Sequence, residues 1–304
     1  MKGIRRALFT VPTRPSFSPA FSLVLLMVIG CGTPDPVVPP PPVVDNAQAI
    51  ERGAQLVNGL ASCGFCHSLD GRTASALSGG RRLQDAYGEV HGPNITGARS
   101  GIAAWSDTDL RRLLRGNIRP DDSEISAQLH RGFEWLADGD ITAITAYLRT
   151  LTPVEHEVAP RRLSFIERNT TGLFESRLEV KGYVPAIGQQ FKREYGGYLV
   201  DHVARCGSCH NKPGDMLSSE SYMAGGNEVS FDGEQRRAPN ITMSTSVGIG
   251  AWSESALVDY LRSGRTPAGR EVDSRFCPVQ FYATASAEQI EAVVAYLRTV
   301  PAVE

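Results

Sequence analysis

Two short runs of residues in this chain combine a pair of thiols with an imidazole. They are Cys63-Gly64-Phe65-Cys66-His67 and Cys206-Gly207-Ser208-Cys209-His210. A C-x-x-C-H run is the attachment signature of a c-type haem, because the two thiols add to the haem vinyl groups and the adjacent His presents an imidazole to the iron. The pattern therefore predicts two covalently bound c-type haems, attached through Cys63, Cys66, Cys206 and Cys209, with His67 and His210 as iron ligands.

Paired cysteines also occur in zinc knuckles and in redox-active dithiols. A zinc site needs four ligands close together, and a thioredoxin-like dithiol belongs to a βαβ pattern. Neither context accompanies two copies that each end in His. Haem attachment is therefore the interpretation that we favour.

The start of the chain has the pattern of an export signal, which we place at residues 1–30. Basic residues are followed by an apolar core, Phe21 to Ile29, which is too short to span a bilayer. The core runs into Val28-Ile29-Gly30-Cys31, which resembles a bacterial lipobox. That resemblance implies cleavage before Cys31 and acylation of its thiol. A plain secretory signal with an unpaired Cys is the alternative.

Residues 31–45 hold a proline-rich segment, with six prolines between Thr33 and Val44. Such a composition favours extended polyproline II structure and cannot build a core. We expect a stalk that holds the rest of the protein away from a membrane surface. The charges of the 304-residue chain are nearly balanced, with 31 Lys and Arg against 33 Asp and Glu, so nothing indicates a nucleic-acid partner.

After the stalk the chain runs twice through one plan. Each copy continues from its haem motif to a Gly pair, a P-N-I-T loop, a G-I-x-x-W-S run and a final A-Y-L-R-T helix. The copies predict one domain at residues 46–153 and another at 190–304, with residues 154–189 as a connector. We expect an all-α fold, because Ser106 with Asp109 and Ser286 with Gln289 have capping-box spacing and no segment shows sustained alternation over the length of a strand.

These motifs resemble those of class I cytochrome c domains. The order of C-x-x-C-H, P-N-I-T, G-I-x-x-W-S and A-Y-L-R-T is similar to bacterial multihaem cytochromes c, some of which are electron-accepting subunits of membrane alcohol and gluconate dehydrogenases. The resemblance implies two tandem class I domains, electron transfer rather than catalysis, a dehydrogenase as redox partner and a place on the periplasmic side of a bacterial membrane. It also implies that Asn94 and Asn240, with Thr96 and Thr242, order the haem propionates.

The chain departs from this family at the second axial ligand of each haem, where relatives commonly supply a Met before the last helix. No Met lies between Met27 and Met216, so the first domain needs another ligand. Its candidates are His130, two residues from the position that the family's Met implies, and then His91 and His156.

In the second domain Cys277 occupies the corresponding position, and Pro278 after it matches the family's M-P pair. A thiolate is a known haem ligand. Met243 is the alternative ligand, and a buried, uncharged Cys277 is the alternative to ligation.

Electron carriage is the favoured function, and two other classes remain open. One is a dihaem enzyme such as a thiosulfate dehydrogenase, in which Cys277 would face the substrate, or a peroxidase with one displaceable ligand. The other is a sensor in which His130 or Cys277 leaves the iron to let a gas bind.

Overall fold

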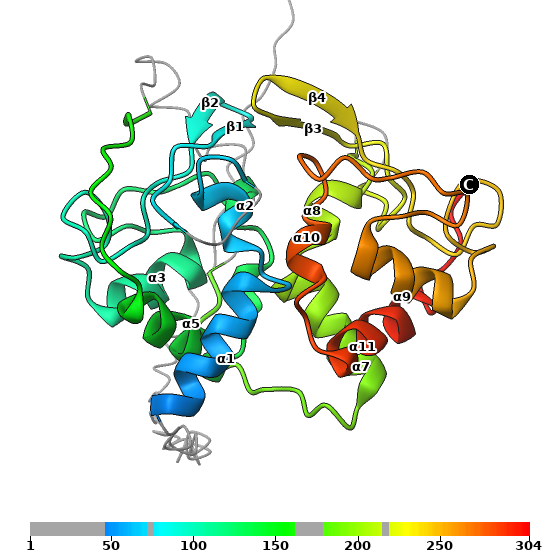
Figure 1. The fold of residues 1–304 in the computed structure, drawn as a ribbon, viewed down its shortest axis with the longest axis horizontal. Coiled ribbons are helices and arrows are strands. Elements are labelled where there is room, and N and C mark those ends of the chain that lie inside the picture. Colours follow the sequence, from blue (N-terminus) through cyan, green and yellow to red (C-terminus); the bar gives the residue numbers. More distant parts are fainter. Residues whose placement is uncertain (1–45, 72–75, 162–178, 215–218) are drawn as a thin grey trace, which may run out of the picture. The chain divides into compact units, whose positions relative to one another are not determined.

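The computed structural model describes residues 46–71, 76–161, 179–214 and 219–304. Within these ranges both halves run from a first helix through the motif helix and a β-hairpin to three further α-helices (Figure 1). The described residues belong to one compact unit. The signal peptide, Cys31 and the proline-rich stalk lie outside the described residues and stay predictions.

The helices of the first half enclose the first motif. They are α1 (Asn46–Asn58), α2 (Cys63–His67), α3 (Asp107–Gly116), α4 (Ala127–His130), the 3₁₀-helix η1 (Phe133–Trp135) and α5 (Asp138–Thr150). The second half has α7 (Lys192–Tyr198), a π-helical turn η2 (Leu199–Val203), α8 (Gly207–His210), α9 (Glu254–Ser263), α10 (Val279–Tyr282) and α11 (Ala287–Leu297). The described parts of the predicted connector, residues 154–161 and 179–189, contain no helix or strand.

In each half the first and last helices cross at a glycine. A Cβ atom added to Gly53 of α1 would lie 2.0 Å from the carbonyl oxygen of Ala143 in α5, and one added to Gly196 of α7 would lie 1.9 Å from that of Ala292 in α11. These distances leave no room for a side chain, so glycine lets the two backbones touch. The equivalent contacts show that the two halves use one way of packing their terminal helices.

The predicted capping boxes are confirmed at α3 and α11. Ser106 accepts from the backbone of Asp109, whose carboxylate accepts in return, and Ser286 and Gln289 make the same exchange. Ala137 occupies the N-cap position of α5, and Asp138 is the first residue of the helix. The buried carboxylate of Asp138 accepts from Arg115 at 2.8 Å and from the backbone of Val184 at 2.9 Å, which ties the connector to α5.

The all-α prediction is wrong, because both halves contribute strands to one antiparallel sheet. The hairpin of β1 (Arg82–Asp85) and β2 (Gly88–His91) joins that of β3 (Glu228–Phe231) and β4 (Glu234–Arg237) in the order β2-β1-β3-β4 (Figure 1). The junction is a single pair, Leu83 opposite Phe231.

The strands were missed because each has only four residues, too few to show alternation. One local signal was present. Asp232 and Gly233 form the two-residue turn between β3 and β4, with φ of 53° and 82°, and an Asp-Gly pair is a strong indication of a hairpin.

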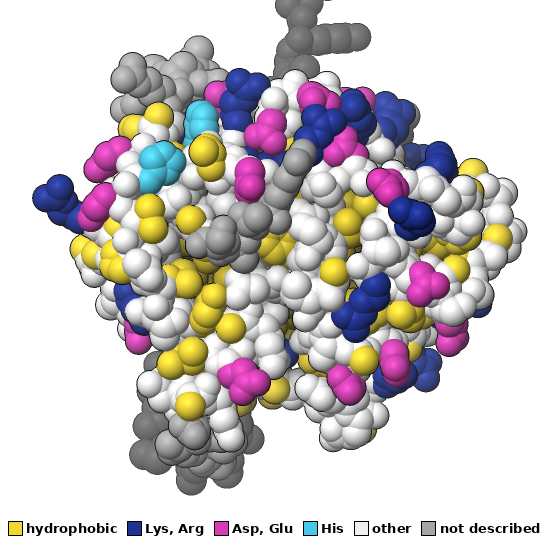
Figure 2. Space-filling view, in the orientation of Figure 1, with side chains coloured by type: hydrophobic (Ala, Val, Ile, Leu, Met, Phe, Trp, Pro, Cys, Tyr) yellow, Lys and Arg dark blue, Asp and Glu magenta, His cyan; other side chains and the backbone are white. Residues whose placement is uncertain are grey.

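The apolar core continues from one half into the other. Leu56, Leu136 and Ile141 of the first half and Leu199 and Ile290 of the second are almost completely buried in the same cluster. Within the described residues, no helix is long and apolar enough to cross a bilayer. On the face drawn in Figure 2, basic and acidic side chains lie close to one another.

Candidate haem-binding sites

The residues of each C-x-x-C-H motif lie in one helical turn that follows a left-handed residue. Ser62 before the first motif has φ of 43°, and Arg205 before the second has φ of 52°. The four motif thiols are free and partly buried. Burial raises the pKa of Cys63 to about 12 and raises that of Cys66 and Cys209 as well, so these groups are neutral thiols near pH 7.

The His of each motif is oriented by a backbone carbonyl. Nδ1 of His67 lies 2.8 Å from the carbonyl oxygen of Pro93, and Nδ1 of His210 lies 2.8 Å from that of Pro239. A carbonyl only accepts, so Nδ1 carries the proton and Nε2 keeps its lone pair. Burial lowers the pKa of both rings, which favours the neutral form that a metal ligand requires.

The P-N-I-T loops hold these carbonyls in place. Oδ1 of Asn94 accepts from the backbone N–H of Thr96 at 2.9 Å and from its hydroxyl at 2.8 Å, while Nδ2 donates to the carbonyl oxygen of Val154 at 2.8 Å. Asn240 makes the same three bonds with Thr242 and Val303. The loop side chains are therefore engaged with their own backbone, and the expected bonds to haem propionates stay a prediction.

His130 lies opposite His67. The two ring centroids are 6.2 Å apart and the ring planes are inclined by 50°. Two imidazoles that share one metal ion have centroids roughly 6 Å apart, since each metal–nitrogen bond is about 2 Å and the rest is half of each ring. Burial, and then the nearby charge of Arg205, lowers the pKa of His130 well below its usual value, so this ring too is neutral.

The other two histidine candidates of the first half lie elsewhere. His91 ends β2 and pairs with Glu89 at 3.9 Å. Nδ1 of His156 donates to the carbonyl oxygen of Ser78 at 2.9 Å. Of the three predicted alternatives, the fold brings only His130 to the motif imidazole.

Cys277 lies among the groups of the second motif. Burial, with a contribution in the same direction from the neighbouring Cys209, raises the pKa of its thiol to about 12. The buried phenol of Tyr282 is close enough to Cys206, Cys209 and Cys277 for each of these thiols to act on its pKa. Tyr260 is a further neighbour, whose hydroxyl donates to the Cys277 sulfur.

Met243 has a different environment. Its sulfur lies 3.9 Å from Nη1 of Arg298, which also donates to the carbonyl oxygen of Trp252 at 3.0 Å. The thioether therefore packs at the end of α11, whereas Cys277 shares its neighbours with the motif thiols.

Comparison with known proteins agrees with this geometry. Residues 50–152 match the family model described as cytochrome c. This part of the chain belongs to the cytochrome c family. The cofactor of a cytochrome c domain is covalently bound haem c, and the free thiols and neutral imidazoles of both motifs fit that group.

Curated relatives extend the similarity over most of the chain. The fructose dehydrogenase cytochrome subunit of Gluconobacter japonicus is 32% identical over 95% of this chain and 60% of its own length. The cytochrome c subunit of a quinone alcohol dehydrogenase from Gluconobacter oxydans (strain 621H) is 28% identical over 85% of this chain and 56% of its own length. A dihaem c-type cytochrome of Cereibacter sphaeroides is 29% identical over 83% of this chain and 86% of its own length. The chain thus spans less than two thirds of the two dehydrogenase subunits.

Sequence reasoning missed two kinds of group around the haem c sites. The carbonyl oxygens of Pro93 and Pro239 carry no side-chain signal, although the repeated P-N-I-T motif marked their loops. Arg205 and Tyr260 lie near the candidate distal ligands only because segments distant in the sequence fold together. When bound, haem supplies one-electron redox chemistry, and the protein sets its potential through axial ligands, burial and hydrogen bonds.

Proposed function

We propose that this chain is an exported dihaem cytochrome c that carries electrons from a dehydrogenase to an acceptor. The observation that carries the proposal is the repeated arrangement of a carbonyl-oriented His beside two free thiols, with a second candidate ligand nearby in each half. The names of three relatives describe cytochrome subunits of fructose, alcohol and gluconate dehydrogenases, which supports a dehydrogenase as the electron donor.

We assign His67 and His130 to the first iron, and His210 and Cys277 to the second. The 6.2 Å separation of the two imidazole rings supports the first pair. The shared surroundings of Cys277 and the motif thiols support the second. Imidazole and thiolate stabilise ferric iron better than a thioether does, so both centres should have lower potentials than a His/Met cytochrome c. Low potentials suit an acceptor of electrons from a low-potential dehydrogenase.

Neighbouring attachment sites support electron transfer between the two haems. The Cys66 and Cys209 thiols are close enough that a charge on the first would raise the pKa of the second. The protein would supply both axial ligands of each iron, so no coordination position would be left for a substrate. We therefore assign no catalytic residue. This is our reason for preferring a carrier to a dihaem enzyme.

Export and anchoring complete the proposal. We propose that the protein is held on the periplasmic side of a bacterial membrane through a lipid on Cys31, with residues 31–45 as the stalk. Cys31→Ser should release the protein from washed membranes with its haem spectrum unchanged. Recovery of the wild-type protein in the soluble fraction would show that the lipobox interpretation is wrong.

Haem count and ligation test the central claim. A pyridine haemochrome assay should give two covalent haems per chain, and the oxidised protein should show two low-spin species by electron paramagnetic resonance. His130→Ala should open one reduced haem to carbon monoxide, and Cys277→Ala the other. His91→Ala and Met243→Leu are matched controls that should leave both haems closed. One haem per chain, or a high-spin wild-type haem with substrate turnover, would contradict the carrier.

A further inference from the structure

The residue before each haem motif has the same backbone conformation but a different side chain. Ser62 and Arg205 are both left-handed, a conformation that is unfavourable for a non-glycine residue. Ser62 is buried in its own half. Arg205 follows the π-helical turn η2 and extends its side chain to the first half, where it reaches the loop that carries His130.

Arg205 contacts that loop on both sides of His130. Its Nη1 donates to the carbonyl oxygen of Leu129 at 2.7 Å, and its guanidinium carbon lies 4.0 Å from the ring centroid of Phe133. The Phe133 ring lies 5.5 Å from the His130 ring. His202, from the same segment as Arg205, adds a bond from its Nδ1 to the carbonyl oxygen of Gly132 at 3.1 Å.

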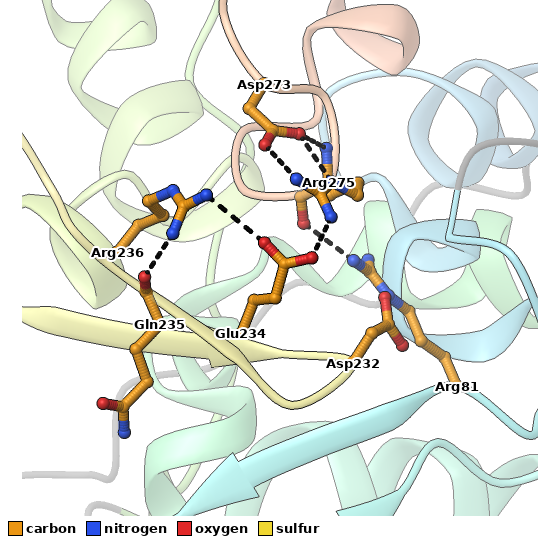
Figure 3. A network of polar contacts seen from close by, with 7 residues as sticks. All are labelled: Arg81, Asp232, Glu234, Gln235, Arg236, Asp273 and Arg275. Carbon is orange, nitrogen blue, oxygen red and sulfur yellow. Dashed lines mark hydrogen bonds and ion pairs between the residues drawn. The ribbon is translucent and has the colours of Figure 1, made fainter.

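An arginine of the first half contacts the second half in the same way. The completely buried side chain of Arg81 donates from Nη2 to the carbonyl oxygen of Arg275 at 2.7 Å, two residues before Cys277 (Figure 3). Its guanidinium carbon lies 4.2 Å from the ring centroid of Phe65 and 4.8 Å from that of Phe231. Each half therefore reaches the distal loop of the other half with one arginine that bonds a loop carbonyl and stacks on a phenylalanine.

We propose that the two haem sites are cross-supported: Arg205 positions the His130 loop of the first half, and Arg81 positions the Cys277 loop of the second. Both are positioning residues that act through the ligand loops, and the inference rests on the ligands assigned under the proposed function. A change at Arg205 should then appear at the first haem, although Arg205 adjoins the attachment site of the second.

The two arginines differ in charge compensation. Arg81 pairs with Asp232 at 3.2 Å, and Arg275 beside it is neutralised by Asp273 and Glu234 (Figure 3). Arg205 forms no ion pair with any residue that the structure describes. An uncompensated positive charge near the first site favours the less positive, reduced state. Arg205 should therefore raise the potential of the first haem as well as hold its loop.

The experiment uses the full-length, haem-loaded protein and the variants Arg205→Met, Arg205→Lys and Arg81→Met. Haem signals are assigned with His130→Ala and Cys277→Ala. Arg205→Met should open the first reduced haem to carbon monoxide and leave the second closed. Arg81→Met should open the second reduced haem more than the first, because Arg81 bonds the Arg275 carbonyl of the second half and also the Phe65 carbonyl of the first motif. Arg82→Met is the matched control, because Arg82 is adjacent to Arg81 but half exposed and forms its ion pair with Glu89 on the neighbouring strand.

Potentiometric titration separates charge from packing. Arg205→Met should shift the ratio of reduced to oxidised first haem at least tenfold towards the oxidised form, which is about 59 mV for one electron. Arg205→Lys keeps the charge and should restore most of that potential. Phe133→Leu, which removes the ring under the guanidinium, should increase carbon monoxide binding at the first haem with a smaller change in potential.

Two outcomes would overturn the cross-support. One is Arg205→Met and Phe133→Leu both leaving the first haem unchanged. The other is Arg205→Met acting on the second haem, or equally on both. A wild-type protein without two closed haems would instead contradict the proposed function, so the two failures are distinguishable.

Discussion

Asn94→Ala tests whether the P-N-I-T loop supports both the fold and the orientation of His67. The side chain is 3% exposed and makes four hydrogen bonds, with the backbone and hydroxyl of Thr96, the carbonyl of Val154 and the hydroxyl of Ser100. Truncation removes all four. It leaves the N–H of the buried Thr96 and the carbonyl of the half-buried Val154 without this partner.

The expected loss of stability in Asn94→Ala follows from the polar groups that are left without a hydrogen-bond partner. Each buried group that loses its partner costs about 1–3 kcal/mol, so the backbone N–H and the hydroxyl of Thr96 together cost roughly 2–6 kcal/mol. A typical domain has only about 5–15 kcal/mol of stability, so the variant should lose a large part of it. The same change loosens the Pro93 carbonyl next to Asn94, which fixes the proton on Nδ1 of His67.

Urea denaturation of the haem-loaded protein, followed by circular dichroism, measures the loss. Asn240→Ala removes three equivalent bonds from a more exposed residue and should cost less. Asn46→Ala, at the exposed start of α1, should change the free energy of unfolding by no more than about 0.5 kcal/mol. The reasoning is refuted if Asn94→Ala loses less than about 1 kcal/mol, or if it loses no more than Asn46→Ala.

Gly53→Ala should destabilise the protein by about 1–3 kcal/mol in the same assay, because a Cβ 2.0 Å from a backbone oxygen forces α1 and α5 apart. Gly139→Ala is the control and should be neutral or slightly stabilising, because a Cβ there would meet no atom within 4 Å. Equal effects of the two glycine changes would contradict the close crossing. Tyr198→Phe should lower the free energy of unfolding by about 1–3 kcal/mol, since the hydroxyl donates to Asp140 at 2.6 Å and accepts from the backbone of Ala137 at 3.1 Å. An unchanged free energy of unfolding would show that these buried bonds do not stabilise the protein. Burial acts to raise the pKa of Asp138, but the bonds from Arg115 and Val184 outweigh it and the net pKa lies below its usual value. The stability from this carboxylate is therefore present above the unfolded pKa of about 3.9 and is lost as the pH falls through the folded pKa. Asp138→Asn should reduce the dependence of the unfolding free energy on pH in this acid range. An unchanged dependence would refute the role given to the Asp138 carboxylate.

Local patterns determined the motifs and the helix starts. The C-x-x-C-H runs need only five consecutive residues to bring thiols and imidazole together, so the sequence alone marked both motifs as candidate attachment sites. The capping boxes of Ser106 and Ser286 are equally local, and they form as expected. The absence of Met between Met27 and Met216 excluded a Met ligand from within the first domain, and this needed no knowledge of the fold.

The sheet depended on contacts that no local pattern encodes. Four-residue strands have almost no periodicity, and β1 gains a second neighbour only when the hairpin of the other half comes beside it. The Asp232-Gly233 turn was the one local indication, and it concerns a hairpin rather than a sheet shared by two repeats.

Tertiary structure also decided which of several equivalent side chains meet at each site. His91 is nearer to the first motif in the sequence than His130 is, but a strand fixes His91 beside Glu89 while α4 brings His130 to His67. Arg205 and Arg81 are ordinary arginines in the sequence, and their contacts with the opposite distal loops arise only where the halves pack together. The thiols and imidazole of each candidate site are close together in the sequence, whereas the second candidate ligand comes from a segment that only folding brings near them.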